Sequence, residues 1–223
     1  MHARKRFSLA LVLIASMAYM AAPCAQSSSG SRLFAPQDLG LLEAPDRDVW
    51  QKPDQIMDAL RIADGSVVAD LGAGGGWFTV RLARRVSQPG IVYAEDIQPQ
   101  MIEAIRRRVL RENLRNVRTV LGTPNDPHLP PSLDAVLVVD AYHEMEIPPA
   151  DPVAIFKNVA LALKPQGRLG IVDFVQGGGG PGPAPDQRVD PEAIIKAAAG
   201  AGLRLAARQR VEPFQFLLVF ERR

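Results

Sequence analysis

The sequence predicts an α/β fold with a mostly parallel, seven-stranded sheet and helices on both faces. From Trp50 onward, short apolar runs alternate with helical patterns, and strands separated by single helices form parallel βαβ units. The last two strand-like segments, 203–210 and 214–220, have only three residues between them. Because a parallel connection needs about a dozen residues, these two strands must be antiparallel. We therefore expect a Rossmann-like sheet with one antiparallel strand near its edge.

The elements follow in order from the spacing of apolar residues. After Pro53, Ile56, Met57 and Leu60 recur at helical spacing, and residues 66–71 form a buried strand. The same criteria predict helices at 77–86, 101–109, 153–163 and 191–201, and strands at 91–96, 117–121, 135–139 and 168–174. A Gly/Pro segment at 177–183 follows the last parallel strand, and we expect a mobile loop there, either a lid or a plain connection.

Length and composition limit the class of protein. The chain has 223 residues, of which 47% are hydrophobic and 22% charged, so it is long enough for one domain with a sizeable core and is not mostly disordered. Its single cysteine, Cys24, excludes an internal disulfide and a cysteine-rich zinc site. We predict no metal site.

The first 25 residues have the pattern of a secretory signal peptide. Arg4, Lys5 and Arg6 precede an uncharged stretch at 7–22, which is shorter than the ~20 apolar residues of a membrane-spanning helix. Pro23 interrupts the motifs both for ordinary cleavage after Ala25 and for lipidation at Cys24, so both routes stay open, as does an uncleaved anchor. We expect export to the periplasm or exterior, with no stable membrane span after processing.

The charge distribution argues against a nucleic-acid partner. Removal of residues 1–25 changes the formal charge from +2 to −1, so the basic character belongs to the export segment. Residues 26–45, which begin Gln-Ser-Ser-Ser-Gly-Ser, are expected to be a flexible linker, and 46–223 the domain. The arginines between 106 and 118 lie opposite the apolar face of a predicted helix, where solvated charge is the ordinary interpretation and RNA binding the alternative.

A glycine-rich turn carries the clearest chemical signal. The strand that ends at Asp70 runs into Gly72-Ala73-Gly74-Gly75-Gly76, which permits a tight turn and close approach of a ligand to backbone N–H groups. The nicotinamide-binding fingerprint fails because Trp77 stands where its third glycine is required. A carboxylate at Asp70 repels a pyrophosphate but pairs well with an ammonium group.

Four ordered segments resemble the class I S-adenosylmethionine (SAM) dependent methyltransferases. They are the glycine turn at 70–76, the second strand at 92–97, the fourth strand at 133–140 and the turn at 163–169. The resemblance extends from about Trp50 to Glu221, and it implies SAM as the cofactor.

The resemblance also implies roles for individual residues. Asp70 and the backbone of Gly72, Ala73, Gly74 and Gly76 would hold the methionine end of SAM. Asp96, followed by Ile97, would accept both ribose hydroxyls, and the alternative is an ordinary carboxylate at a strand end. Asp126 would face the adenine amino group, or else it is a plain turn residue between Asn125 and Pro127.

Candidate catalytic residues follow the fourth predicted strand, where an open α/β sheet binds its ligand. His143 titrates near neutral pH and is a candidate general base, with a structural histidine as the alternative. Tyr142 and Asp140 are adjacent candidates, and Tyr142 is also placed to pack against the cofactor.

Several acceptor classes are excluded. The sequence at 140–143, Asp-Ala-Tyr-His, lacks the Pro-Pro-Tyr pattern of amino-group nucleic-acid methylases. The domain also has no cysteine nucleophile for cytosine C5 chemistry. We therefore expect a methyltransferase acting on a small molecule. The alternative is an exported protein of the same fold that binds a ligand or partner without catalysis.

Overall fold

The computed structural model describes residues 33–177 and 179–223. The predicted signal peptide at 1–25 and the possible lipidation site at Cys24 lie outside these residues. Among the described residues, no helix has both the length and the hydropathy needed to cross a membrane.

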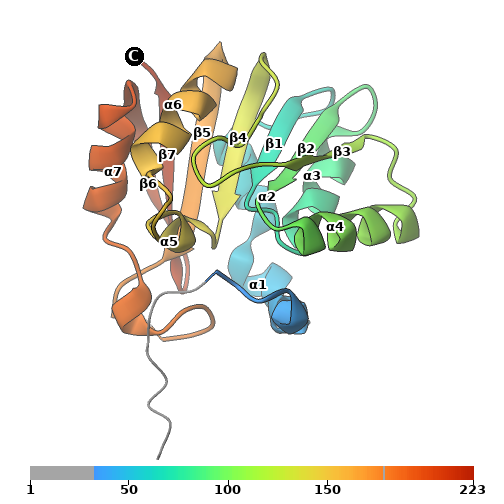
Figure 1. Ribbon diagram of the computed structural model, residues 1–223, viewed down its shortest axis with the longest axis horizontal. Helices are drawn as coiled ribbons and strands as arrows, with labels where there is room; N and C mark the ends of the chain where they lie inside the picture. The colour runs from blue at the N-terminus through green and yellow to red at the C-terminus, as the bar shows by residue number, and fades with distance from the viewer. Residues whose placement is uncertain (1–32, 178) are drawn as a thin grey trace, which may run out of the picture. The chain divides into compact units, whose positions relative to one another are not determined.

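The described residues form a seven-stranded sheet with the order β3-β2-β1-β4-β5-β7-β6 (Figure 1). Strands β1 to β5 run parallel, and β7 is antiparallel to both of its neighbours, β5 and β6. The predicted fold class, including the reversed strand next to the edge, is therefore confirmed. The strands are β1 (Val67–Leu71), β2 (Ile91–Asp96), β3 (Val117–Leu121), β4 (Leu133–Val139), β5 (Leu163–Phe174), β6 (Leu203–Val211) and β7 (Gln215–Arg222).

Helices cover both faces of the sheet because its central strands are apolar on both sides. In β4, Val136 and Val138 pack toward α6 and α7, whereas Ala135 and Leu137 pack toward α2 and α3. All four side chains are at most 1% exposed, as expected for a doubly covered parallel sheet. The helices are η1 (Pro36–Leu42), α1 (Arg47–Gln51), α2 (Pro53–Ala59), α3 (Trp77–Val86), α4 (Pro99–Arg111), α5 (Tyr142–Met145), α6 (Pro152–Ala162), η2 (Pro185–Gln187) and α7 (Pro191–Gly200).

The strand order fixes where a ligand can enter. From β1 the chain moves outward through β2 and β3, and then returns to place β4 on the other side of β1. This reversal between β1 and β4 is the topological switch point, and ligands of open α/β sheets bind beyond the carboxyl ends of the two strands there. Both the glycine turn after β1 and the segment after β4 lie at this edge.

The chain just before the domain differs from the predicted flexible linker. The described part of that range, 33–45, includes η1, and Leu39 packs close to Gly75 of the glycine turn. Glu43 forms an ion pair of 2.5 Å with Arg108 of α4. Apolar and charged partners far along the chain therefore hold residues 33–45, and the linker boundary at 26–45 stays a prediction.

Hydrogen bonds from Arg188 anchor the Gly/Pro segment, for which the sequence predicted a mobile loop. Arg188 is 5% exposed, and its guanidinium donates to the carbonyl oxygens of Val175, Pro181 and Pro183 at 3.1–3.2 Å. The guanidinium carbon also lies 5.3 Å from the centre of the Phe174 ring. A buried cation therefore organises the loop from within, because it satisfies carbonyl groups that no strand or helix pairs.

Candidate functional site

The glycine turn is fastened to the end of β2 by two carboxylates. The N–H of Gly72 donates to Oε2 of Glu95 at 3.3 Å, and the N–H of Gly74 donates to Oδ2 of Asp96 at 2.9 Å. Gly72 and Gly74 have positive φ values of 71° and 54°, which glycine adopts without steric cost. Together with Gly76, which caps α3 in the left-handed conformation, they produce the turn that the sequence predicted.

Asp70 lies beneath this turn. Its side chain is buried, and Oδ2 accepts a hydrogen bond of 2.6 Å from the hydroxyl of Thr79 in α3. Burial raises the pKa of Asp70 to about 6, although the hydrogen bond from Thr79 acts in the opposite direction. This carboxylate has no ion-pair partner among the described residues, so a bound cation would stabilise its charged form.

Glu95 and Asp96 add two more buried acids at the same edge. Burial raises the pKa of Asp96, and it raises the pKa of Glu95 well above the usual range, with the charge of Asp96 contributing further. Oε1 of Glu95 is buried and has no hydrogen-bond partner in the part of the chain that the structure describes. An unpaired carboxyl oxygen is costly to bury, so it indicates a place for a donor or a cation.

The structure places Ile97 and Asp126 on neighbouring loops. Ile97 directly follows β2, and Asp126 lies in the turn after β3, the strand that pairs with β2. Oδ1 of Asp126 accepts from the N–H of His128 at 2.9 Å, and its carbonyl accepts from the N–H of Thr123 at 2.8 Å. Asp126 therefore has the contacts of a turn residue, and its predicted contact with adenine stays a prediction.

Asp140 is engaged by residues from two distant elements. Its Oδ2 accepts from Arg47 of α1 at 3.0 Å, and its Oδ1 accepts from the amide of Gln215 in β7. The Arg47 guanidinium also lies 4.3 Å from the centre of the Trp77 ring. Burial raises the pKa of Asp140 to about 7, whereas the charge of Arg47 acts to lower it. Because both oxygens are occupied, the side chain joins α1, β4 and β7, and we do not include it in the proposed mechanism.

His143 is paired with a fully buried carboxylate at the end of β5. Nδ1 of His143 lies 3.3 Å from Oδ2 of Asp173, which also accepts the backbone N–H of His143 at 3.3 Å. Burial lowers the pKa of His143, but the hydrogen bond and charge of Asp173, with Glu144 and Asp140, outweigh it and raise the pKa above 6.5. A carboxylate at Nδ1 leaves Nε2 as the basic nitrogen of the neutral ring.

Tyr142 belongs to the core. Its side chain is fully buried and stacks on Phe156 of α6, with ring centres 5.7 Å apart. Burial raises the pKa of the Tyr142 phenol, with the charge of Glu146 contributing. The side chain therefore supports the chain beneath His143, and its predicted contact with a cofactor stays a prediction.

Residues 33–42, which we call the strap, cross the switch point. The N–H of Phe34 donates to Oε2 of Glu144 at 3.0 Å, and the amide of Gln98 donates to the carbonyl of Phe34 at 3.0 Å. Glu144 follows β4 and Gln98 follows β2, so a segment bonded to both spans the end of β1 between them. The strap thus lies over the glycine turn.

The sequence analysis assigned no role to Glu95, Glu144 or the strap, and it did not predict that Asp173 pairs with His143. Asp173 had a usable signal, because it ends an apolar strand in the same way as Asp70 and Asp96. The strap had none, since its partners lie 64 and 110 residues away. No group of three His, Cys, Asp or Glu side chains in the described residues is arranged to hold a metal ion.

Residues 68–167 match a protein family described as a methyltransferase domain. An arsenite methyltransferase of Halobacterium salinarum is 33% identical over 141 residues, covering 63% of this chain and 34% of the relative. An uncharacterized methyltransferase of Mycobacterium tuberculosis is 39% identical over 121 residues, covering 54% of this chain and 44% of the relative. The chain thus spans less than half the length of these relatives.

Solved structures share the fold. The structure of a SAM-dependent methyltransferase from Aquifex aeolicus superposes with a TM-score of 0.78 at 24% identity, covering 84% of this chain and 98% of the other. The [4+2]-cyclase SpnF has a TM-score of 0.63 at 15% identity, covering 77% of this chain and 80% of the other. A fold that is also found in a cyclase does not by itself define the reaction, which must be argued from the site.

Substitution of Gly72 tests the close packing of the turn. A Cβ atom there would lie 2.8 Å from Cβ of Ala141, in addition to the strain of a φ of 71°. Gly65 is the matched control, because it has a φ of 77° and nothing within 4 Å of its added Cβ. We expect Gly65→Ala to lower the free energy of unfolding by about 1 kcal/mol and Gly72→Ala by about 3 kcal/mol. Equal losses in urea denaturation would show that Ala141 does not confine the turn.

Proposed function

Because this domain belongs to the class I SAM-dependent methyltransferase family, we propose that the protein transfers a methyl group from SAM to a small-molecule acceptor, and that His143 removes a proton from that acceptor. The proposal rests mainly on the His143–Asp173 pair at the switch point. The base follows β4 and the uncompensated acids lie at the ends of β1 and β2, so both border the switch point at which ligands of this architecture bind.

The residues at the end of β1 and β2 fit SAM, which supplies an electrophilic methyl group on a positively charged sulfur. Asp70, Glu95 and Asp96 are buried and have no ion-pair partner among the described residues. A cofactor carrying sulfonium and ammonium charges would compensate these acids. In our proposal Asp70 and the backbone of the glycine turn hold its methionine end, and Asp96 accepts the ribose hydroxyls.

His143 is suited to accept a proton once the acceptor is bound. Asp173 is 0% exposed and orients the imidazole through Nδ1, so that Nε2, which lies 3.9 Å from Oε1 of Glu144, is the nitrogen that would act as the base. Asp173 also stabilises the imidazolium that forms, which is the role of an orienting carboxylate beside a histidine base. In our proposal the strap, which is bonded to Glu144 and Gln98, also limits the access of water, and a dry site strengthens these charge interactions.

The residues favour an acceptor that reacts through oxygen or nitrogen. A proton-removing base is useful for a hydroxyl, phenol or amine, whose nucleophilic form has lost a proton. The arsenite relative acts on a soft ion, and such ions prefer thiolate ligands. Cys24 is the only cysteine here and precedes the domain, so arsenite is not the acceptor that we propose.

Export remains a proposal from the N-terminal pattern of residues 1–25. SAM is made in the cytosol, so an exported protein would be separated from its cofactor. For this reason the second hypothesis is a protein that binds a ligand or partner without catalysis. Intact mass of the purified protein tests the maturation step, because a mass for all 223 residues would contradict cleavage.

A radiolabel assay tests the catalytic proposal. The protein is incubated with methyl-labelled SAM and a panel of small phenols, alcohols and amines, and label in the product is counted. We expect His143→Gln to lower the transfer rate by about 100-fold or more while SAM binding is retained. Arg208→Gln is the control, because Arg208 is exposed and pairs with Glu192 of α7, away from every residue of the proposed site. Transfer by the His143 variant at the wild-type rate would contradict the role of the base.

The pH profile separates positioning by Asp173 from a purely structural role. Asp173 favours the charged imidazolium, so Asp173→Asn lowers the pKa of His143. Activity requires the neutral ring and is lost as pH falls through this pKa. We therefore expect the acid limb of kcat/KM to move to lower pH by about one unit in the variant. An unchanged limb would exclude the coupling.

A further inference from the structure

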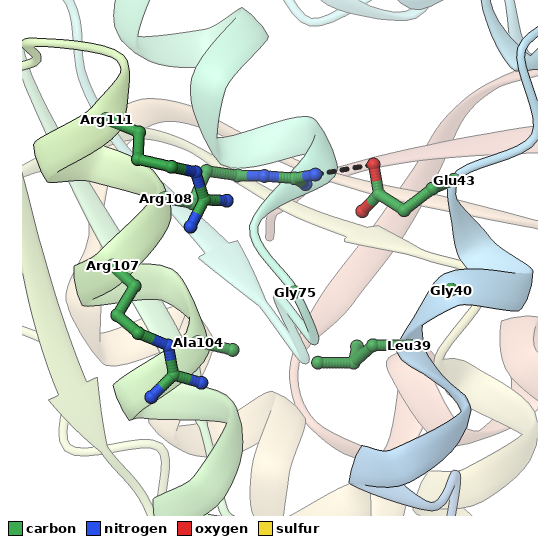
Figure 2. A pocket seen from close by; sticks show the side chains of 8 residues that line it. All are labelled: Leu39, Gly40, Glu43, Gly75, Ala104, Arg107, Arg108 and Arg111. Carbon is green, nitrogen blue, oxygen red and sulfur yellow. Dashed lines mark ion pairs between the residues drawn. The ribbon is translucent and has the colours of Figure 1, made fainter.

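A cavity lies beside the glycine turn, and His143 is not among its lining residues. It has a volume of about 210 Å³ and is bounded by η1 on one side and α4 on the other, with Gly75 between them (Figure 2). Its charged lining consists of Arg107, Arg108 and Arg111 from α4, and Glu43, which directly follows the strap. None of the acids of the proposed SAM site contributes to it.

The cavity holds more positive than negative charge. Arg108 forms an ion pair of 2.5 Å with Glu43, but Nη1 of Arg108 is buried and has no hydrogen-bond partner among the described residues. Arg107 and Arg111 have neither an ion pair nor a side-chain hydrogen bond with any residue that the structure describes. Figure 2 shows both side chains extending from α4 toward the space in front of Gly75. Three guanidinium groups thus face a single carboxylate.

We propose that this cavity binds a phosphate group. Guanidinium groups present several N–H donors in a planar fork that matches the oxygens of a tetrahedral anion, and such charge-assisted hydrogen bonds are strong. The spacing of the arginines supports one compact anion, because Arg111 lies four residues after Arg107 and three after Arg108, the separations at which side chains are neighbours on a helix. The unpaired Nη1 of Arg108 supplies a buried donor, and Arg107 and Arg111 supply mobile donors at the rim.

Glu43 opposes the anion and limits its affinity. Its carboxylate occupies one side of the Arg108 guanidinium and repels any second negative group in the cavity. Because Glu43 also anchors the strap, an anion that draws Arg108 away from it affects the segment that covers the glycine turn. The phosphate cavity is therefore suited to be an effector site that lies next to the proposed SAM site and is separate from the acceptor site.

Titration with inorganic phosphate tests this inference without any reference to methyl transfer. Binding is measured by calorimetry in the absence of SAM at constant ionic strength, and we expect saturation with a Kd of about 1 mM. The double variant Arg107→Ala/Arg111→Ala is expected to weaken binding by about tenfold or more. Arg106→Ala is the matched control, because Arg106 lies on the same helix but pairs with Glu103 and does not line the cavity.

The variant Glu43→Gln provides a test in the opposite direction. It removes the competing carboxylate while retaining its size, and we expect phosphate to bind about three- to tenfold more tightly. Absence of saturable binding, or equal weakening by Arg106→Ala and the double variant, would overturn the proposal.

Two further probes distinguish the source of the phosphate. If adenosine 5′-monophosphate binds more tightly than inorganic phosphate, and the double variant weakens its binding in the same way, the ligand is a phosphate ester. A short single-stranded RNA whose binding weakens equally with Arg106→Ala would instead show a general basic surface, and would contradict a defined pocket.

Discussion

The burial of several carboxylates at one edge of the sheet is the constraint on which the site depends. Asp70, Glu95 and Asp96 lie at the ends of adjacent strands and are almost fully buried, yet none of them forms an ion pair with another described residue. Asp140 and Asp173 are compensated by Arg47 and His143, respectively. The uncompensated group surrounds the glycine turn, and the compensated pairs lie after β4 and β5. This separation divides the site into a part for a cationic cofactor and a part for proton removal.

The fold was predictable because its signals are local. Apolar runs that end in Asp70 or Asp96 identify buried parallel strands, and the three residues between the last two strands determine their antiparallel pairing. The glycine turn was predictable for the same reason, since positive φ at Gly72 and Gly74 requires glycine in the sequence itself. The parts of the site that lie at strand ends, such as Asp70 and Asp96, could therefore be predicted from the sequence.

The remaining parts depend on contacts between residues far apart in the chain. Nothing in the sequence near Phe34 indicates that its backbone bonds to Glu144, and nothing near the Gly/Pro segment indicates that Arg188 anchors it. The engagement of Asp140 by Arg47 and Gln215 likewise joins three distant elements. Such contacts hold residues 33–42 at the end of β1 and join Asp140 to α1 and β7, and neither arrangement has a signal in the local sequence.

Calorimetry with SAM at pH 6, in two buffers with different ionisation enthalpies, tests the central claim most directly. Since burial raises the pKa of Asp70 to about 6, part of the free protein carries a proton there, and a bound cation expels it. We predict binding with a net release of protons, weaker affinity below pH 6, and a much lower affinity for Asp96→Asn. No binding at millimolar SAM, or a net uptake of protons, would contradict the account.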